Sequence, residues 1–483
     1  MANYFCTDSV EEQVDYLTDK IKDIKNNKSN ATNLENGTGT GSLAQKRLKS
    51  DGVTWTTAKA YQGASTAFGG GTQAGRTEEE FNSYFWDSST NEPINGGKGK
   101  NSEGKILDNN RLTYEQSYSY AVAEGELTKA LGRSSHAEGN NTEAIGTHSH
   151  AEGLSTRAEG YAAHAEGCAA QAIGAYSHSE GIGTNASGEN SHAEGANTKA
   201  SGLNSHAEGS GSRALGSNAH AEGQGTNAFE ENSHAEGKLT TASGSGCHAE
   251  GESTIASGLQ CHTEGLSTKA SGFQTHAEGY KTTASGYRSH AEGGGTTASG
   301  DNSHAEGFGT VASNAESHAE GNSTIASGLR SHAEGLHTQA TDMCAHAEGN
   351  STIASGRHSH AEGSYTIAEG ENSHAEGKNT IAKGKNSHAE GDNTKALHEN
   401  SHAEGFYTIT SRNYQHVCGK YNKDSTSALF IVGNGYLDTD DARKNALEVL
   451  EDGTIRVQNF DSNGNRIGMA TLKIVNGVLT ITT

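Results

Sequence analysis

Large apolar and aromatic side chains are scarce in this chain, and proline is almost absent. Of its 483 residues, 31% are hydrophobic, 6% are aromatic and only Pro93 is a proline. Ordinary globular domains bury many large apolar side chains to offset the entropy that is lost on folding. The composition therefore disfavours a series of globular domains and leaves either disorder or a repetitive fold.

Features of membrane, secreted and nucleic-acid-binding proteins are also missing from the sequence. There is no run of about 18 apolar residues, and the first residues lack a basic stretch followed by an apolar one. The formal net charge is -23, with 59 acidic and 36 basic residues, so most of the surface should repel phosphate. We expect no membrane insertion, no cleaved signal and no nucleic acid partner.

The six cysteines lack the spacing of a zinc site or of a disulfide scaffold. Nothing indicates an oxidising compartment, so we predict free thiols. Cys247 and Cys261 are 14 residues apart and would stack on each other if that interval is a structural repeat.

Histidine recurs every 14 residues from His136 to His402, and His416 continues the series. The consensus is S-H-A-E-G-x-x-T-x-A-S-G-x-x, and no insertion interrupts it between His136 and Arg412. Strict periodicity favours a stacked solenoid, which buries small residues and satisfies its backbone hydrogen bonds turn by turn. The repeat therefore makes disorder the weaker interpretation.

Fourteen residues are enough for two strands of about four or five residues and two tight turns. S-H-A-E is predicted as the first strand and x-T-x-A as the second. Side chains alternate along a strand, so Ala and Ser share one face and His and Glu share the other. The interior of so thin a roll accepts only small groups. Ala and Thr are therefore predicted to point inward, and His and Glu outward.

The second glycine of the repeat is replaced in five copies, by Glu230, Asn314, Asp342, His398 and Arg412. Asn and Asp tolerate the left-handed backbone conformation that glycine adopts readily. We therefore predict a left-handed residue in this column.

The repeat resembles the head of YadA-like trimeric adhesins, a left-handed parallel β-roll of 14-residue units. The SHAEG variety, followed by HVCGKYN at 416–422, IVGNG at 431–435 and DARKNA at 441–446, looks like bacteriophage and prophage fibre proteins. The resemblance implies a homotrimer mounted on a virion that is assembled in the host cytoplasm. The predicted fold class is an all-β, trimeric, left-handed parallel β-roll solenoid with a short N-terminal helix or coiled coil and a C-terminal β cap.

The His and Glu columns do not vary in any copy from 136 to 405. A row facing solvent has no reason to stay constant, whereas a packed three-fold interface constrains every turn. We therefore predict that His and Glu line the trimer interface, hydrogen-bonded across chains, with an exposed or mixed placement as the alternative. The representative residues of this ladder are His136, Glu138, His150, Glu152, His192, Glu194, His206, Glu208, His234, Glu236, His304, Glu306, His374, Glu376, His402 and Glu404.

Before the regular repeats, a heptad-like seam predicts a short trimeric coiled coil or an amphipathic helix that lies on another virion protein. The seam consists of Val10, Val14, Leu17, Ile21 and Ile24. Residues 26–42 are polar and glycine-rich, which is typical of a linker. Residues 65–74 match the repeat, with 76–117 as an insertion. We predict four regions: 1–60 for attachment, 61–120 as a degenerate coil with the inserted loop, 121–416 as the repeats, and 417–483 as the cap.

After Ser411 the sequence alternates apolar and polar residues in several runs. Asn476-Gly477 separates two of these runs and predicts a β-hairpin. We expect these strands to form a compact β cap that closes the end of the roll.

A motif repeated along the whole chain is architecture, whereas an active site is a single constellation in a pocket. The sequence has no HExxH, GxSxG or P-loop motif, so we predict no enzyme, no catalytic residue, no metal and no cofactor. The predicted function is a structural or adhesive phage fibre, on the head or tail, that contacts a host glycan or protein. A bacterial cell-surface trimeric adhesin and a fibre with a self-cleaving C-terminal segment are the alternatives.

Overall fold

The computed structural model describes residues 120–482 continuously, together with short strands at 33–36, 43–46, 59–60, 66–70, 73–74, 86–87 and 92–93. Every regular element in this part of the chain is a β-strand. The predicted helical seam from Val10 to Ile24 lies outside the described residues. Two units, Met1–Gly246 and Cys247–Thr483, are distinguished by their contacts and are described one at a time.

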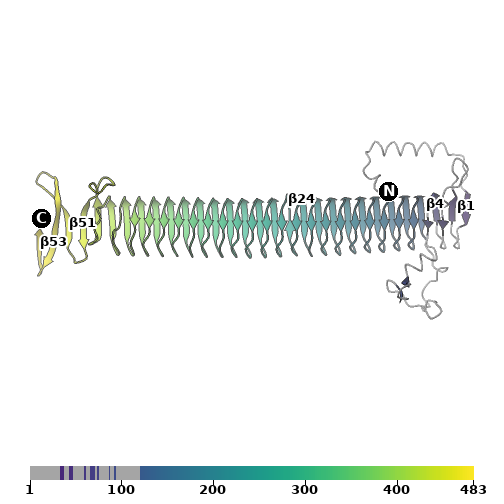
Figure 1. Ribbon diagram of the computed structural model, residues 1–483, viewed down its shortest axis with the longest axis horizontal. Helices are drawn as coiled ribbons and strands as arrows, with labels where there is room; N and C mark the ends of the chain where they lie inside the picture. Colours follow the sequence, from purple (N-terminus) through teal and green to yellow (C-terminus); the bar gives the residue numbers. More distant parts are fainter. Residues whose placement is uncertain are drawn as a thin grey trace. The chain divides into compact units, whose positions relative to one another are not determined.

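One turn of the repeat consists of a longer and a shorter strand, as in β10 (His136–Asn140) and β11 (Glu143–Ala144). Each strand pairs in parallel and in register with its equivalent one turn later, so that His136 lies beside His150. Figure 1 shows these strands side by side in each unit. The predicted parallel β-solenoid with two strands per turn is confirmed. The strand limits were wrong, since the first strand begins at His and extends past Gly, and the second has only two residues.

In Met1–Gly246 the regular turns begin at β8. The longer strands are β8 (Val122–Glu126), β10, β12 (His150–Leu154), β14 (His164–Cys168), β16 (His178–Ile182), β18 (His192–Ala196), β20 (His206–Ser210), β22 (His220–Gln224) and β24 (His234–Lys238). The shorter strands are β9 (Lys129–Ala130), β11, β13 (Arg157–Ala158), β15 (Gln171–Ala172), β17 (Asn185–Ala186), β19 (Lys199–Ala200), β21 (Arg213–Ala214), β23 (Asn227–Ala228) and β25 (Thr241–Ala242).

The same pattern fills most of Cys247–Thr483. The longer strands are β26 (His248–Ala249), β28 (His262–Leu266), β30 (His276–Tyr280), β32 (His290–Gly294), β34 (His304–Phe308), β36 (His318–Asn322), β38 (His332–Leu336), β40 (His346–Asn350), β42 (His360–Ser364), β44 (His374–Lys378), β46 (His388–Asp392), β48 (His402–Phe406) and β49 (His416–Lys420). The shorter strands are β27 (Ile255–Ala256), β29 (Lys269–Ala270), β31 (Thr283–Ala284), β33 (Thr297–Ala298), β35 (Val311–Ala312), β37 (Ile325–Ala326), β39 (Gln339–Ala340), β41 (Ile353–Ala354), β43 (Ile367–Ala368), β45 (Ile381–Ala382) and β47 (Lys395–Ala396).

Irregular turns precede β8 in the first unit. β4 (Thr66–Gly70) pairs in register with β8, and β5 (Gln73–Ala74) pairs with β9, which confirms the predicted degenerate turn. The structure also contains a further turn that the sequence did not predict. It is formed by β2 (Leu43–Lys46), which pairs with β4, and by β3 (Lys59–Ala60), which pairs with β5. The remaining strands here are β1 (Asn33–Asn36), which is antiparallel to β2, and the antiparallel pair β6 (Trp86–Asp87) and β7 (Glu92–Pro93). The linker role of 26–42 remains a prediction, with the short strand β1 inside this segment.

At the other end of the sequence, parallel pairing continues from β49 to β50 (Ala428–Asn434). β50, β51 (Asn445–Leu450), β52 (Ile455–Phe460), β53 (Arg466–Val475) and β54 (Val478–Thr482) then pair antiparallel in sequence order. Asn476 and Gly477 join the last two strands with φ angles of 52° and 78°, as a tight hairpin turn requires. The predicted hairpin is confirmed, and the capping role of these strands remains a prediction.

The interior of each turn is filled by the Ala that follows His, by Thr, by the second Ala and by the Ser that precedes His. In the turn that begins at His304, the buried residues Ala305, Thr310, Ala312 and Ser317 are at most 1% exposed. Ser side chains also bond inside the wall, as where Ser289 donates to the carbonyl of Gly286 at 2.9 Å. The predicted inward orientation of the small residues is confirmed.

Such an interior leaves no space for a larger side chain. We expect Ala305→Leu to lower the free energy of unfolding by about 3 kcal/mol or more, because overpacking forces the stacked turns apart. Thr297→Ile is the control, since its column points outward and holds Val311 and Ile325 in the next two turns. Urea unfolding monitored by circular dichroism measures both variants, and equal stability would contradict the packing described here.

The second glycine of the repeat does not adopt the predicted left-handed conformation. Gly286 has no positive φ, but a Cβ there would lie 1.9 Å from the carbonyl oxygen of Gly300 in the next turn. Close approach of the backbones, and not φ, therefore selects glycine in this column. Left-handed residues occur at the first glycine, as at Gly307 with φ 104°, and at the seventh and fourteenth positions of the consensus, as at Ser323 and Asn302.

Cys261, Cys344 and Cys418 carry free thiols, as the sequence predicts, and Cys247 is likewise not disulfide-bonded. Cys168 is disulfide-bonded, so that prediction is wrong for this residue.

Candidate interaction face: the histidine and glutamate rows

The longer strand of each turn presents its His and Glu on the face opposite to its buried Ala. In β34, His304 and Glu306 flank Ala305, which is 0% exposed, while their side chains remain 35% and 32% exposed. In-register pairing repeats this arrangement on successive turns of each unit. The sheet face therefore carries one continuous row of imidazoles and a parallel row of carboxylates.

The imidazole rings of successive turns are stacked. In Cys247–Thr483, for example, the ring centroids of His304 and His318 are 4.9 Å apart and those of His360 and His374 are 4.8 Å apart, with interplanar angles of 3° and 1°. In Met1–Gly246, His136 and His150 stack at 4.8 Å. Strand spacing fixes this distance, because each ring occupies the same rotamer on neighbouring strands.

One ring nitrogen of each of these histidines faces the carboxylate row. The Nε2 atoms of His192, His304 and His360 are buried, and no hydrogen bond to them occurs in the described part of the chain. The Nε2 of His304 lies 3.7 Å from Oε2 of Glu306, which is too long for a hydrogen bond. A buried polar atom without a partner is destabilising by about 1 to 3 kcal/mol.

Burial and stacking lower the pKa of several histidines in the row, among them His192 and His360. The pKa of His276 falls to about 4, chiefly because burial disfavours its charged form and then because His290 and His262 lie on either side. His402 is also lowered to about 4 by burial and by His416 and His388. His276 and His402 are therefore neutral at pH 7.

Neighbouring glutamates hydrogen-bond to one another, so they cannot all be ionised easily. The pKa of Glu320 is raised to about 7 by hydrogen bonds with Glu334 and Glu306, while the pKa values of those two neighbours are lowered by their bonds to Glu320. In the first unit the pKa of Glu152 is raised to about 7 by Glu166 and Glu138. Protons are therefore shared along the carboxylate row.

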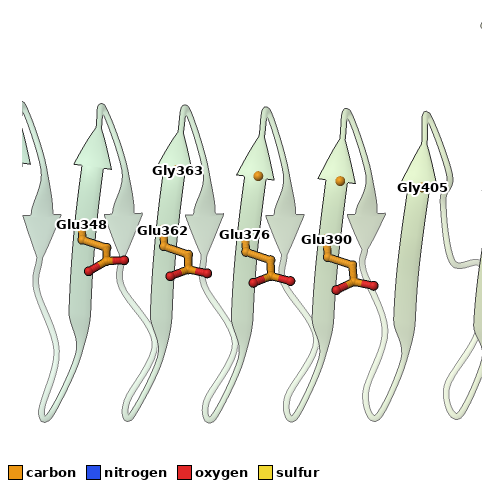
Figure 2. A pocket seen from close by; sticks show the side chains of 8 residues that line it. Glu348, Glu362, Gly363, Glu376, Glu390 and Gly405 are labelled. Atoms are coloured by element: carbon orange, nitrogen blue, oxygen red, sulfur yellow. The ribbon is translucent and has the colours of Figure 1, made fainter.

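A shallow groove runs beside the glutamates where the first glycine of each turn has no side chain. In Cys247–Thr483 its volume is about 460 Å³, and Figure 2 shows four of its carboxylates on successive parallel strands. It is lined by Glu348, Glu362, Gly363, Glu376, Gly377, Glu390, Gly391 and Gly405. A second groove, of about 610 Å³, is lined in Met1–Gly246 by Glu138, Glu152, Gly153, Glu166, Gly167, Glu180, Gly181, Glu194 and Gly195.

The rows also contain groups of possible metal ligands, such as His192, Glu194 and His206, whose nearest ligand atoms lie within 4.8 Å of one another. Zinc binds imidazole nitrogen at about 2.0 to 2.1 Å, so two nitrogens on one ion are at most about 4.2 Å apart. The ring centroids of His192 and His206 are 4.8 Å apart and the rings are parallel within 1°, so equivalent nitrogens on the two rings have about the same separation, which exceeds that limit. The spacing therefore does not preform a site in which two successive rings share an ion.

Each unit thus brings together the ladder residues that the sequence singled out within it. The set from His136 to Glu236 lies along Met1–Gly246, and the set from His304 to Glu404 lies along Cys247–Thr483. Their place at a three-fold interface stays a prediction. Sequence reasoning missed the groove, although the unvarying glycine after each Glu was its signal.

No helix in the described residues is long and apolar enough to cross a bilayer.

The fold and its rows define a parallel β-solenoid of 14-residue turns with one chemically uniform face. The family model described as "YadA head domain repeat (2 copies)" matches residues 123–149, 277–303, 347–373 and 375–397. The turn is therefore similar to the YadA head repeat, an adhesion-type fibre module. No curated protein matches the chain significantly.

Proposed function

We propose that this chain is the subunit of a non-catalytic, adhesion-type fibre and that it assembles as a homotrimer through the histidine and glutamate rows. The observation that carries the proposal is the row of glutamate side chains, about a third exposed, that runs beside a groove in each unit. A second copy can pack its side chains into this groove and donate hydrogen bonds to the carboxylates. Self-association thereby satisfies polar groups that are repeated on successive turns.

The C-terminal hairpin supports the same proposal independently. Ile474, Val478, Leu479 and Ile481, on β53 and β54, are between 59% and 72% exposed in the single chain. Soluble proteins rarely leave adjoining large apolar side chains uncovered unless they form an interface. We propose that the same strands of two further copies cover these apolar side chains.

For the location of the fibre we propose a phage virion, with attachment through the N-terminal region and contact with a host glycan or protein. Its support is the likeness of the SHAEG variety and of 416–446 to phage and prophage fibres. A bacterial cell surface is the second candidate, which the match to the YadA head repeat favours. Immunogold labelling of induced phage particles and of intact cells separates the two.

The assembly is tested on the purified full chain by native mass spectrometry. The expected mass is three times the chain mass of 50.2 kDa. His304→Lys combined with His318→Lys places two permanent charges in the row, and we expect the trimer to lose about 3 kcal/mol or more. Asn302→Lys with Glu316→Lys is the matched control, since Arg288 and Arg330 already occupy that exposed column. A wild-type mass of one chain, or a trimer that the row variant leaves as stable as the control, would refute the proposal.

A further inference from the structure

Two successive turns replace the buried serine before His with cysteine. Cys247 and Cys261 occupy this position, and each is 2% exposed. In other turns a serine hydroxyl here donates to the carbonyl of a glycine, as Ser289 does to Gly286. The two thiols therefore lie inside the wall of the solenoid and not on its surface.

The two cysteines are direct neighbours. β26 and β28 pair with His248 beside His262, which places the preceding residues on adjacent strands. The backbone N–H of Cys261 donates to Sγ of Cys247 at 3.3 Å, and the thiol of Cys247 donates to the carbonyl of Gly258 at 2.7 Å. Adjacent strands are about 4.8 Å apart, which lies within the Cα separation of about 4.4 to 6.8 Å that a disulfide spans.

β26 contains two residues, whereas β28 and β30 contain five. The backbone N–H groups of Glu250 and Glu252 still donate to the carbonyls of Thr263 and Gly265 at 2.9 and 2.8 Å, so the two turns remain paired beyond β26. Thr263 replaces the usual Ala on β28, and its buried Oγ1 makes no hydrogen bond in the described part of the chain. The larger side chain interrupts the uniform Ala column next to the thiol pair, at the place where a covalent link would join the two turns.

The environment also favours reaction of one thiol. Hydrogen bonding with Cys247, and then with Thr275, lowers the pKa of Cys261 to about 6 in spite of burial. The Cys261 thiol donates to the carbonyl of Gly272 at 2.9 Å, and its lowered pKa favours conversion to the nucleophilic thiolate near neutral pH.

We propose that Cys247 and Cys261 form an oxidation site at which a hydroperoxide converts the two stacked thiols into a disulfide between successive turns. The Cys261 thiolate attacks the peroxide and breaks its O–O bond, leaving a sulfenic acid on Cys261 and water or an alcohol as the reduced product. The Cys247 sulfur then attacks the sulfenic sulfur, loses its proton and releases water. Two electrons leave the thiol pair and reduce one hydroperoxide.

Hydrogen peroxide added to the reduced full chain tests the proposal. After removal of peroxide, alkylation during unfolding and proteolysis, mass spectrometry should find a cross-linked peptide pair containing Cys247 and Cys261, lighter by about 2 Da than the two thiol peptides together. The oxidised chain should also melt several degrees higher than the reduced chain. Peptides in which both residues are alkylated, or in which Cys261 is oxidised without a cross-link, would overturn the proposal.

Serine variants provide matched controls that keep the fold, because serine is the usual residue at this position. Cys247→Ser and Cys261→Ser should each abolish the cross-link and the rise in melting temperature. The double variant Cys344→Ser with Cys418→Ser should retain both, since neither of these cysteines has a cysteine neighbour in register. A melting rise that persists in Cys247→Ser would show that oxidation acts elsewhere and would refute the assignment.

Discussion

Acidification from about pH 7 to about pH 4 is expected to lower the melting temperature steeply, with most of the loss below about pH 5.5. In the folded chain the pKa values of His276 and His402 are lowered from 6.5 to about 4 by burial and by neighbouring imidazoles. The unfolded chain therefore binds more protons than the folded chain between these two values. Proton uptake on unfolding makes stability fall as the pH falls.

The glutamates act in the opposite direction over part of this range. Glu320 and Glu376, with folded pKa values raised to about 7, take up protons in the folded chain before they do so in the unfolded chain. The stabilisation that these raised pKa values give is fully present below the ordinary pKa of 4.5 and is lost as the pH rises through 7. As the pH falls from 7, it therefore at first offsets the loss of stability caused by the histidines. Their neighbours Glu334 and Glu390, whose pKa values are lowered, add to the loss below about pH 4.5.

Differential scanning calorimetry across the pH series measures this effect. His276→Gln removes one group from the row, so proton uptake on unfolding near pH 5 should fall by about one. His358→Gln, at an exposed position outside the row, is the control substitution. A melting temperature that stays constant from pH 7 to about pH 4 would contradict the burial of the histidines.

Substitution of the first glycine column is expected to have the largest effect of any single change on stability. Gly307 has a φ of 104°, and a Cβ on it would lie 2.1 Å from the carbonyl oxygen of Gly321. Gly307→Ala therefore combines backbone strain with a clash against backbone that cannot move without separating the turns. We expect the free energy of unfolding to fall by about 3 kcal/mol or more.

Gly295→Ala is the matched control for this prediction. Gly295 also has a positive φ, 67°, but no atom lies within 4 Å of a Cβ added there. Only the conformational penalty remains, which is about 1 kcal/mol. If chemical denaturation shows Gly307→Ala to be as stable as Gly295→Ala, the close stacking of the glycine backbones is not what fixes this column.

The period, the interior and the terminal hairpin could be predicted from the sequence because each follows from local chemistry. The 14-residue spacing of His, the small size of Ala305 and Thr310, and the Asn476-Gly477 pair are all visible without knowledge of distant contacts. The turn formed by β2 and β3 could not be found, since the spacing from Leu43 to Thr66 departs from the period. Insertions at that end of the repeats remove the signal that identifies the others.

The left-handed positions were assigned to the wrong column for a different reason. Asn occupies many of the true positions, as at Asn302 and Asn386, but Arg330, Glu316 and His358 occupy others. These side chains face solvent, so each position tolerates the cost of a left-handed backbone, which is about 1 kcal/mol. The residue types in this column therefore vary, and the sequence does not mark it as constrained. The glycine column that was chosen is constrained by a backbone contact between turns, which one repeat considered alone does not reveal.

Carboxyl labelling of the purified full chain tests most directly whether the rows are covered by other copies. The reagents are a water-soluble carbodiimide and an amine, and mass spectrometry of the peptides gives the extent of labelling at each residue. In the single chain, Glu306 and Glu334 have side chains 32% and 34% exposed, against 50% for Glu316 and 42% for Glu371 in outward columns. The account predicts that Glu316 and Glu371 react while the row glutamates stay protected until the assembly is dissociated. Row glutamates that react in the native protein as readily as those two controls would contradict it.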